Sequence, residues 1–518
     1  MEDLNLSMFR AYDIRTPSAS LPPHLSKRLA QAEALYFREV LNAPGVVVAH
    51  DARLSGPAYL EQAVEEYTRV GLDVVYVPTA CSASMFYFSA MKHPQYAAVM
   101  FGASHNPAGD TGRKILGPEV RPIAKQIGPE GGLDKIKEFY IQGQSAPTSQ
   151  VRGRITAYDP ISDYIDYSMR LAGVAEGGLS GVSVLHDYLN GATGREMMLA
   201  FRRAGAALFP MHYTANGMFP LGDPNPVKPD VVSPGLEALK SGLYLPRNSD
   251  NKQIERQNFL LGTFFDGDGD RIDFYRGDGQ YMSSSFVYAA ILPYIKERFP
   301  GENLVVFADL KSNPLAVIEM AKCGVTVQVI RNGHSQIKQE MLNTPQAFGA
   351  VEESAHFYER FFFEGRGPYC TENTLYIALL VTRAWAENPK RFDELLGIQA
   401  QTCRAREWGY KFPTDSQRAE ALQAVEEYFK SIGASAMTKM KSGLELEATL
   451  MRRGVPFDID ANTRLADDWL QVCHRISQSE NGLARWEVVG ANQEIVDDAK
   501  RQIARIVRQF GAGDEYKG

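Results

Sequence analysis

Short apolar runs alternate with longer amphipathic stretches in the first part of the chain. Apolar residues 46–49 precede an amphipathic stretch at 59–70, and further apolar runs follow at 74–77 and 97–100. Wholly apolar strands are typical of sheets buried on both faces, and amphipathic stretches of this length are typical of helices. The pattern therefore predicts βαβ units around a largely parallel sheet.

The same alternation occurs twice more. An apolar run at 181–185 is followed by an amphipathic stretch at 194–204, and a further set comprises 304–307, 314–322 and 325–329. We therefore expect three α/β units in series.

The last part of the chain has a different pattern. A long helical pattern at 416–432 leads eventually to an apolar run at 486–489, and this arrangement is typical of an α+β domain. The predicted fold class is thus α/β, with a carboxy-terminal α+β domain after the three α/β domains.

Polar and turn-forming runs mark the expected domain boundaries. The small polar residues 142–148 and the turn residues 276–279 indicate two boundaries, and a third is placed near residue 395. The predicted domains are residues 1–154, 155–280, 281–395 and 396–518. Two further stretches, 235–258 and 435–465, are polar and weakly periodic, so we expect insertions or mobile loops there.

Length and composition agree with several globular domains. The 518 residues correspond to three or four domains at about 150 residues each. With 44% hydrophobic and 23% charged residues, the chain can fill several apolar cores and is not mainly disordered.

Net charge indicates which partners to expect, and the amino terminus and the cysteines indicate a cellular location. The net charge of −7 disfavours general binding to nucleic acid or to an anionic membrane, so we expect neither as a partner. The amino terminus is acidic and no apolar run approaches about 18 residues, which indicates neither a signal peptide nor a spanning helix. The five cysteines lack CxxC spacing, as expected for reduced thiols. A cytoplasmic location is predicted.

Three aspartates follow the apolar run 260–265, within the sequence Asp-Gly-Asp-Gly-Asp-Arg at 266–271. On a flat strand alternate residues lie about 6.6 Å apart, whereas two oxygens on one Mg²⁺ lie no more than about 4.2 Å apart, so the backbone must curl. The intervening glycines permit this curl. Crowded carboxylates repel one another without a cation, and three oxygen ligands suit Mg²⁺. We therefore predict a metal site at Asp266, Asp268 and Asp270.

Two other classes of acidic site use similar residues. An EF-hand loop requires glycine at its sixth position and glutamate at its twelfth, which here hold Arg271 and Gly277, so that class is excluded. A haloacid-dehalogenase-like phosphatase uses an Asp-x-Asp pair, but Asp270 stands where a hydroxyl or aliphatic residue is expected. That interpretation is weakened and stays open.

A second chemical motif, Gly-Ala-Ser-His-Asn-Pro at 102–107, follows the strand-like run that ends at residue 100. Its beginning is similar to a serine-hydrolase nucleophile elbow, but Asn106 replaces the final glycine of that motif. The loop serine, Ser104, could instead carry a phosphoryl group, with Lys114 ten positions later as a cation or proton carrier.

Several segments, in order along the chain, resemble the α-D-phosphohexomutases, most closely the bacterial phosphomannomutase/phosphoglucomutase branch. The similar segments are residues 9–15, 103–107, 266–271, 333–338, 352–356 and 475–480. The resemblance implies four domains around a central cleft, each contributing one loop. It also implies that Ser104 is phosphorylated and shares Mg²⁺ with the three aspartates.

The resemblance assigns roles to further residues. The implied catalytic residues are Ser104, His105, Lys114, Arg15 and Arg271. The implied substrate-binding residues are Tyr12, Lys311, His334, Glu352, Ser354, His356, Arg475, Ser477, Gln478 and Ser479. Lysine has a reference pKa of about 10.4, so Lys114 can act as a base near neutral pH only if its surroundings lower that pKa, and we expect such a lowering.

Some positions depart from the family's pattern. Thr111 replaces an asparagine shortly before Lys114, Ala355 and Val351 replace glycines of the sugar-binding stretch, and Asn481 replaces a proline. The two glycine replacements are expected to stiffen that stretch or to change substrate preference.

The predicted function is a phosphosugar mutase that interconverts hexose 1-phosphate and hexose 6-phosphate of mannose, glucose or both. The predicted cofactors are Mg²⁺ and phosphoserine at Ser104, with a sugar bisphosphate as intermediate and activator. Phosphoglucosamine mutase is the close alternative, and a metal-dependent sugar phosphatase or a catalytically silent sugar-phosphate sensor are the others. The small-molecule phosphosugar is the only partner expected, and the sequence leaves the oligomeric state open.

Overall fold

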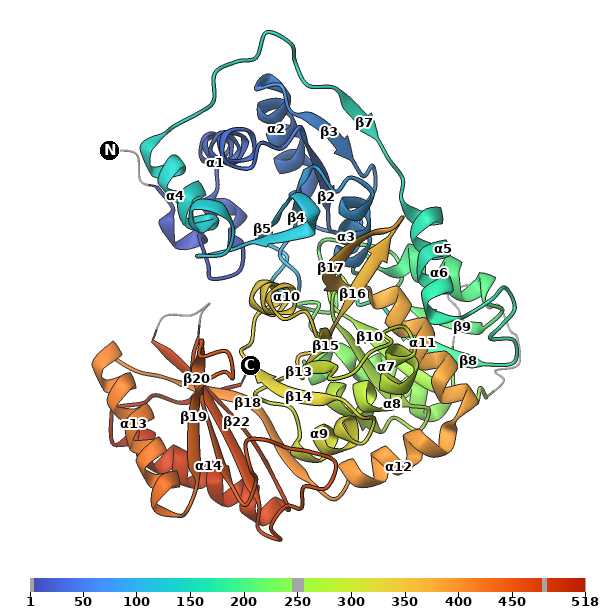
Figure 1. Cartoon of the computed structure of the whole chain (residues 1–518), viewed down its shortest axis with the longest axis vertical. Coiled ribbons are helices and arrows are strands. Elements are labelled where there is room, and N and C mark those ends of the chain that lie inside the picture. Colours follow the sequence, from blue (N-terminus) through green and yellow to red (C-terminus); the bar gives the residue numbers. More distant parts are fainter. Residues whose placement is uncertain (1–3, 245–255, 478–481, 518) are drawn as a thin grey trace. The chain divides into compact units, whose positions relative to one another are not determined.

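The computed structural model describes residues 4–244, 256–477 and 482–517, and its helices and strands are labelled in Figure 1. The chain folds into two compact units. Unit 1 comprises Met1–Ser283, His334–Asn343 and Ala355–Glu387. Unit 2 comprises Ser284–Gly333, Thr344–Ser354 and Asn388–Gly518. The predicted domain boundaries near residues 154, 280 and 395 stay predictions.

The first sheet of unit 1 has the strand order β1-β5-β4-β2-β3-β7, with β6 paired to β5. Strands β2, β3, β4 and β7 are parallel, and β1, β5 and β6 add antiparallel pairs. Its strands are β1 (Ile14–Pro17), β2 (Gly45–His50), β3 (Asp73–Tyr76), β4 (Ala97–Phe101), β5 (Asp110–Gly117), β6 (Arg121–Ile123) and β7 (Ile155–Ala157). The helices of this region are α1 (Pro23–Leu35), α2 (Gly56–Arg69), α3 (Ala83–Lys92) and α4 (Leu133–Gln142). Strands β2 and β4 are buried along nearly their whole length, as their continuous apolar sequences predict.

The second sheet of unit 1 has the order β12-β11-β10-β8-β9. Strand β10 is parallel to β8 and antiparallel to β11, so the residues after β10 turn back toward the sheet. The strands are β8 (Ser183–Asp187), β9 (Ala207–Met211), β10 (Leu261–Phe265), β11 (Ile272–Arg276) and β12 (Tyr281–Met282). The accompanying helices are α5 (Ile161–Ala172), α6 (Gly194–Arg203) and α7 (Pro229–Ser241).

Unit 1 also contains elements from later in the chain. Helix α10 (His334–Asn343) contacts β6 and β17, and helix α11 (Thr374–Glu387) contacts α5. Strands β16 (His356–Phe363) and β17 (Arg366–Glu372) form an antiparallel hairpin in which Tyr358 lies opposite Glu372. These late segments complete the surroundings of the predicted site in unit 1.

Unit 2 begins with parallel strands in the order β14-β13-β15. These are β13 (Val305–Asp309), β14 (Thr326–Ile330) and β15 (Ala347–Glu352), with helices α8 (Ser284–Lys296), α9 (Pro314–Ala321) and α12 (Pro389–Gln399). Lys311 lies two residues after the carboxyl end of β13, in the region where α/β sheets place binding residues.

The carboxy-terminal part of unit 2 has a six-stranded sheet in the order β19-β20-β21-β22-β18-β23. Neighbouring strands of this sheet are antiparallel, and helices α13 (Asp415–Ser431) and α14 (Gln493–Arg508) share an apolar core with it. The strands are β18 (Cys403–Lys411), β19 (Ser435–Lys439), β20 (Glu445–Arg453), β21 (Leu470–Ile476), β22 (Leu483–Gly490) and β23 (Glu515–Lys517).

The predicted fold class is confirmed, and the predicted β-runs form strands β2, β3, β4, β8, β13 and β14. The expectation of irregular structure at 435–465 was wrong in part, because β19 and β20 lie there and β20 buries Leu446, Leu450 and Met451. The expectation for 235–258 was also wrong in part, because α7 continues to Ser241. Pro234 lies inside that helix and weakened its sequence pattern. Residues 245–255 lie outside the described residues.

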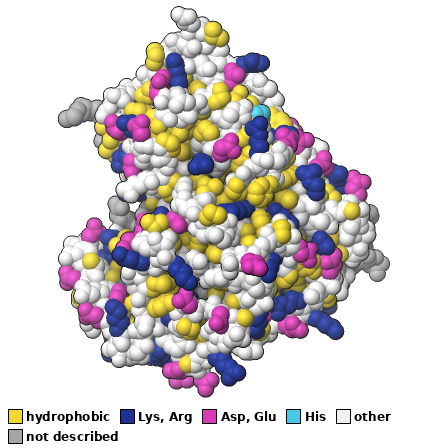
Figure 2. Space-filling model, viewed as in Figure 1, with side chains coloured by type: hydrophobic (Ala, Val, Ile, Leu, Met, Phe, Trp, Pro, Cys, Tyr) yellow, Lys and Arg dark blue, Asp and Glu magenta, His cyan; other side chains and the backbone are white. Residues whose placement is uncertain are grey.

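The surface carries charges of both signs. On the face shown in Figure 2, Lys and Arg side chains are interspersed with Asp and Glu side chains. Within the described ranges, each helix is too short or too polar to cross a membrane.

Candidate functional site

Ser104 contacts the predicted metal-binding residues directly within unit 1. We call residues 102–107 the serine loop and residues 266–271 the aspartate loop; they follow β4 and β10. The Ser104 hydroxyl donates a hydrogen bond of 2.6 Å to Oδ2 of Asp266, and both side chains are buried. Two motifs that are far apart in the sequence therefore meet at one buried position.

The backbone at this contact is tightly constrained. Ser104 has a φ of 49°, in the left-handed region that residues other than glycine rarely adopt. A Cβ atom added at Gly267 would lie 2.5 Å from the backbone oxygen of Ser104, so the close approach of the two loops requires glycine there. Non-glycine residues in this conformation cluster at functional sites, where the surrounding structure holds them.

A buried arginine, which the sequence analysis did not identify, holds the serine loop. The Arg53 guanidinium donates hydrogen bonds of 2.9, 2.7, 2.5 and 3.2 Å to the backbone oxygens of Ser104, Asn106, Pro107 and Asp110. Its Nε lies 3.1 Å from Oδ2 of Asp51, and the same oxygen accepts a hydrogen bond from the N–H of Ala103. The position of Asp51, directly after the apolar strand β2, was the available signal.

Lys114 pairs with two of the three aspartates. Its Nζ donates hydrogen bonds of 2.6 Å to Asp268 and 2.5 Å to Asp270. The oxygens of Asp266, Asp268 and Asp270 come within 4.8 Å of one another, which is close enough for the three side chains to hold one metal ion. Oδ1 of Asp268 and Oδ1 of Asp270 are buried without a hydrogen-bond partner in the described residues.

The electrostatics of this cluster correct one expectation. Burial opposes the charge on Lys114, but Asp268 and Asp270 outweigh burial and raise the pKa of Lys114 well above its usual value. The expected lowering of its pKa was therefore wrong, because the carboxylates that surround it favour the ammonium form. Burial, with Asp270 and Asp268, raises the pKa of Asp266. Burial also favours neutral Asp270, but Lys114 and Arg271 hold its pKa well below the usual range.

Three more of the predicted catalytic residues lie around Ser104. Nδ1 of His105 lies 3.2 Å from the Ser104 hydroxyl, and burial, with Arg271 and Arg15, lowers the pKa of His105 well below its usual value. Arg15 donates from Nη1 to the side-chain oxygen of Asn106 over 3.0 Å. The Arg271 backbone N–H donates to Oδ1 of Asp266 over 3.2 Å, and Nε of its guanidinium lies 4.0 Å from Oδ2 of the same carboxylate.

The predicted sugar-contacting residues of unit 1 extend this cluster. Nε of Arg271 donates to Nε2 of His356 over 3.1 Å. At the start of α10, the ring of His334 lies 6.0 Å from the ring of Tyr12, and Ser335 donates to the backbone oxygen of Tyr12 over 3.3 Å. Burial, Lys338 and Lys114 lower the pKa of His334 well below its usual value.

A second group of predicted residues lies in unit 2. Lys311 is almost wholly buried, with its Nζ 3.8 Å from Asp309 and 4.0 Å from Glu487. Glu352 accepts hydrogen bonds from the side chain of Asn332 (2.9 Å) and the backbone N–H of Gly333 (3.2 Å). Ser354 is half-buried at the end of the second segment of unit 2.

The predicted phosphate-binding loop begins at the end of β21. Arg475 lies 2.9 Å from Oε2 of Glu407, and Ser477 is buried, with its backbone N–H hydrogen-bonded to Leu483. The other two predicted residues of this loop, Gln478 and Ser479, lie outside the described residues.

The sequence analysis also missed two partners of Arg475. Arg485 lies opposite Arg475 in the register of β21 and β22, and its Nη1 lies 2.5 Å from Oε1 of Glu407. Burial opposes the charge on Glu407, but Arg475, Lys311 and Arg485 together hold its pKa far below the usual range. Two adjacent guanidinium groups form a site suited to a phosphate, and in this structure both contact the carboxylate of Glu407.

Comparison with known proteins agrees with this geometry. Residues 6–130 match the model of phosphoglucomutase/phosphomannomutase alpha/beta/alpha domain I, and residues 284–402 match domain III of the same family. The chain belongs to the α-D-phosphohexomutase family.

Relatives and a solved structure cover most of the chain. A phosphomannomutase of Escherichia coli strain K12 is 25% identical over 430 residues, covering 82% of this chain and 86% of that protein. A phosphoglucosamine mutase of Clostridium tetani is 24% identical over 385 residues, covering 74% of this chain and 78% of that protein. The crystal structure of a phosphoglucomutase/phosphomannomutase family protein from Burkholderia thailandensis shares the fold, with a TM-score of 0.77, 19% identity and 98% coverage of both chains.

Three of the four departures from the phosphohexomutase pattern lie in the part of the chain that the structure describes. Ala355, where a glycine is usual, has a φ of 73° and is buried, and its backbone oxygen accepts a hydrogen bond from the N–H of Ile272 over 3.0 Å. Thr111 is buried in β5 opposite Thr16 of β1. Val351 is buried in β15, and Asn481 lies outside the described residues.

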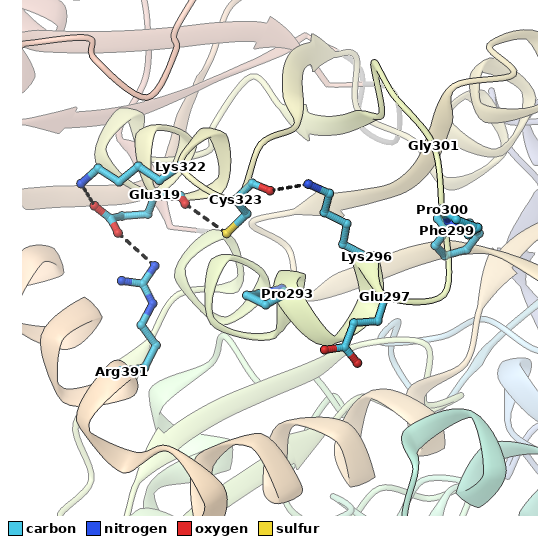
Figure 3. Close-up of a pocket in the computed structure, with 10 residues that line it drawn as sticks. All are labelled: Pro293, Lys296, Glu297, Phe299, Pro300, Gly301, Glu319, Lys322, Cys323 and Arg391. Carbon is cyan, nitrogen blue, oxygen red and sulfur yellow. Dashed lines mark hydrogen bonds and ion pairs between the residues drawn. The ribbon is translucent and has the colours of Figure 1, made fainter.

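A cavity of about 700 Å³ lies elsewhere in unit 2, between the ends of α8 and α9 and the start of α12 (Figure 3). Glu319 is held there between Lys322, at 2.5 Å, and Arg391, at 3.0 Å. The lining residues are Pro293, Lys296, Glu297, Phe299, Pro300, Gly301, Glu319, Lys322, Cys323 and Arg391. They include none of the predicted site residues, so this cavity is separate from the proposed chemistry.

Proposed function

We propose that this protein is a phosphosugar mutase that moves a phosphoryl group between C1 and C6 of a hexose through phosphorylated Ser104. One observation carries the proposal: the buried Ser104 hydroxyl lies 2.6 Å from Asp266, beside two further carboxylates and the ammonium of Lys114. A serine held among cation-binding groups suits a phosphoryl carrier better than a serine hydrolase.

The aspartate loop fits a magnesium ion. Its three carboxylates offer hard oxygen ligands within one small space, and two of their oxygens lack hydrogen-bond partners in the described residues. Asp266, Asp268 and Asp270 would hold the ion, with an oxygen of phosphorylated Ser104. A bound Mg²⁺ supplies positive charge to the phosphoryl oxygens. Lys114 contacts Oδ2 of Asp268 and Oδ2 of Asp270, which would leave the two Oδ1 atoms for the ion.

The chain's own residues can bind and orient the transferring group. A hydroxyl of the sugar would attack phosphorus, the bond between phosphorus and the Ser104 Oγ would break, and the hydroxyl proton would leave to a base. His105, 3.2 Å from the Ser104 hydroxyl, is placed to exchange a proton with that oxygen. Arg271 and Arg15 would stabilise charge that develops on the phosphoryl oxygens, because their guanidinium groups are already oriented.

We assign the phosphate that is not being transferred to the unit 2 residues around Arg475. Arg475, Arg485 and Lys311 provide three cations, and Ser477 adds a hydroxyl donor. The hexose contacts would come from Tyr12, Lys311, His334, Glu352, Ser354 and His356. Glucose and mannose phosphates are the proposed substrates, a sugar bisphosphate the activator, and the cytoplasm the site of action.

Two measurements on the full-length protein test the proposal. Intact-mass analysis should find the wild-type protein one phosphoryl group heavier than its sequence, whereas Ser104→Ala should carry none. Assays with the 1-phosphates of glucose, mannose and glucosamine, with Mg²⁺ and a sugar bisphosphate, should yield the 6-phosphates. Release of inorganic phosphate in their place would indicate a phosphatase, and an unphosphorylated protein without turnover would indicate a sensor. Preference for the amino sugar would favour a phosphoglucosamine mutase.

A further inference from the structure

A buried ion pair lies directly behind one of the predicted sugar-contacting residues. Oε1 of Glu372 lies 3.4 Å from Nδ1 of His356, and Oε2 of the same carboxylate lies 2.6 Å from Nζ of Lys338. The side chains of Lys338 and Glu372 are 1% and 0% exposed, so neither charge is solvated. Nζ of Lys338 also lies 3.8 Å from the centre of the Tyr87 ring.

The local structure explains why Glu372 reaches His356. Glu372 ends β17 opposite Tyr358, and His356 lies two residues before Tyr358 on the same face of β16. Diagonal neighbours of this kind are within reach of long side chains. Lys338 comes from α10, which packs against β17.

The hydrogen bonds define which ring nitrogen of His356 carries the proton. Arg271 donates to Nε2, so Nε2 must present a lone pair, and the proton of the neutral ring lies on Nδ1. Nδ1 lies near two carboxylates, 3.4 Å from Oε1 of Glu372 and 3.8 Å from Oδ1 of Asp270, and these contacts are electrostatic rather than hydrogen bonds. A metal ion bound by Asp270, His356 and Glu372 would need the Nδ1 lone pair, which conflicts with the hydrogen bond from Arg271. The group therefore suits a proton better than a metal ion.

We propose that Glu372, anchored by Lys338, is a positioning residue that fixes the His356 ring with its proton on Nδ1 and so keeps Nε2 toward Arg271. The role rests on the proposed function, because His356 and Arg271 are the residues expected to meet the sugar and the phosphoryl group. A buried carboxylate that orients a histidine in this way controls both the tautomer and the ring direction.

Two variants and a matched control test this role in the full-length protein. Glu372→Gln keeps the shape of the side chain but removes its charge. The double variant K338M/E372L replaces the whole ion pair by apolar groups of similar volume, which buried pairs often tolerate without loss of stability. The control, Glu319→Gln, removes the charge of another buried glutamate, which Lys322 and Arg391 hold in the unit 2 cavity of Figure 3 and which has no part in the proposed chemistry.

The first readout is kinetic. Both test variants should lower kcat for glucose 1-phosphate by about 10- to 100-fold, as for carboxylates that orient metal-binding histidines. Glu319→Gln should leave kcat unchanged. Equal losses in Glu319→Gln and Glu372→Gln would overturn the proposal, because any buried glutamate would then have the same effect.

The second readout does not depend on mutase activity. Nitrogen-15 NMR of protein labelled at its nine histidines, assigned with His356→Gln, should show a slowly exchanging proton on Nδ1 of His356. That signal should persist in Glu319→Gln and be lost in K338M/E372L. A proton on Nε2 in the wild type, or an unchanged signal in the double variant, would overturn the proposal. If the wild type lacks mutase activity, the proposed function fails while the NMR result still decides the role of Glu372.

Discussion

The Arg53 guanidinium donates a hydrogen bond of 2.9 Å to the backbone oxygen of Ser104. The same guanidinium also contacts three other backbone oxygens of the segment that follows Ser104. The conformation of the serine loop is therefore held through its backbone, which leaves the Ser104 hydroxyl to contact Asp266. A planar group with five donors in a fixed arrangement can satisfy several such oxygens at once.

Replacing Arg53 by lysine should destabilise the protein although the charge is kept. A single ammonium cannot satisfy all of these oxygens, and each buried acceptor left unpaired costs about 1–3 kcal/mol. Urea unfolding should show a loss of this order, together with a lower kcat. Arg203→Lys is the control, because the side chain of Arg203 is 42% exposed, and its free energy of unfolding should change by less than about 0.5 kcal/mol. Equal stability of Arg53→Lys and wild type would contradict the proposed role.

Replacing Glu196 by glutamine should remove a pH dependence of stability. Burial raises the pKa of Glu196 to about 7, from an ordinary value of 4.5. The stabilisation linked to its protonated form is complete below about pH 4.5 and is lost as the pH rises through about 7. At pH 8, the free energy of unfolding of Glu196→Gln should exceed that of the wild type by up to about 3 kcal/mol. At pH 4.5 the two proteins should have similar free energies of unfolding. The free energy of unfolding would be measured by urea denaturation at both pH values. The same change with pH in the wild type and in Glu196→Gln would show that the carboxyl is not buried as described.

Magnesium should stabilise the folded protein through the aspartate loop. An ion that binds only the folded state, at 100 times its Kd, adds about 2.7 kcal/mol. Thermal unfolding should therefore shift upward with Mg²⁺ in the wild type but not in Asp268→Asn, and chelation should abolish turnover. Asp278→Asn, at an exposed turn, is the matched control and should respond like the wild type. A full shift in Asp268→Asn would place the ion elsewhere.

Arg485→Lys should raise the KM for hexose 1-phosphate by about tenfold. Arginine binds phosphate bidentately and lysine does not, and about 1.4 kcal/mol of lost binding is a tenfold change. Intact-mass analysis should show that Ser104 is still phosphorylated, because Arg485 lies in the separate cluster around Glu407. Arg501→Lys, on the exposed side of α14, should keep the wild-type KM. If Arg475→Lys raised the KM and Arg485→Lys did not, Arg485 would not belong to the phosphate site.

Ala355→Gly should stabilise the protein. The left-handed conformation costs an alanine about 1–2 kcal/mol, and the greater freedom of glycine in the unfolded chain offsets about 0.4–1 kcal/mol of that gain. The free energy of unfolding should therefore rise by up to about 1 kcal/mol, measured by urea denaturation. Ala355→Val should be clearly destabilising, because a β-branched residue tolerates this conformation less well. A destabilised glycine variant would show that packing of the methyl group outweighs the backbone strain.

The parts of the site predicted from sequence are those whose chemistry lies in a short continuous segment. The aspartate loop follows an apolar strand and contains its own glycines, so both its position and its curl follow from residues 260–271. The strands of the α/β sheets were predicted for the same reason, since burial on both faces leaves a continuous apolar run. Strand β20 was missed because its buried residues do not alternate regularly with polar ones.

The missed residues have partners far away in the sequence. Arg53, Glu372 and Arg485 are single charged residues in ordinary polar surroundings, and a sequence pattern does not distinguish them from surface charges. The pKa of Lys114 shows the same limit, because the two carboxylates that raise it are more than 150 residues away. A local pattern predicts the residue type, whereas the electric field at that residue depends on the fold.

Unit 1 is not one continuous piece of chain, since α10 and the β16–β17 hairpin are encoded after the first strands of unit 2. During translation Arg271 therefore leaves the ribosome 85 residues before its partner His356, a delay of about 4 to 17 s at ordinary rates of synthesis. Until then Arg271 lies among the aspartates without the histidine that its guanidinium contacts. A chain that stops before Glu387 lacks part of unit 1, so no single cut in the gene yields either unit alone.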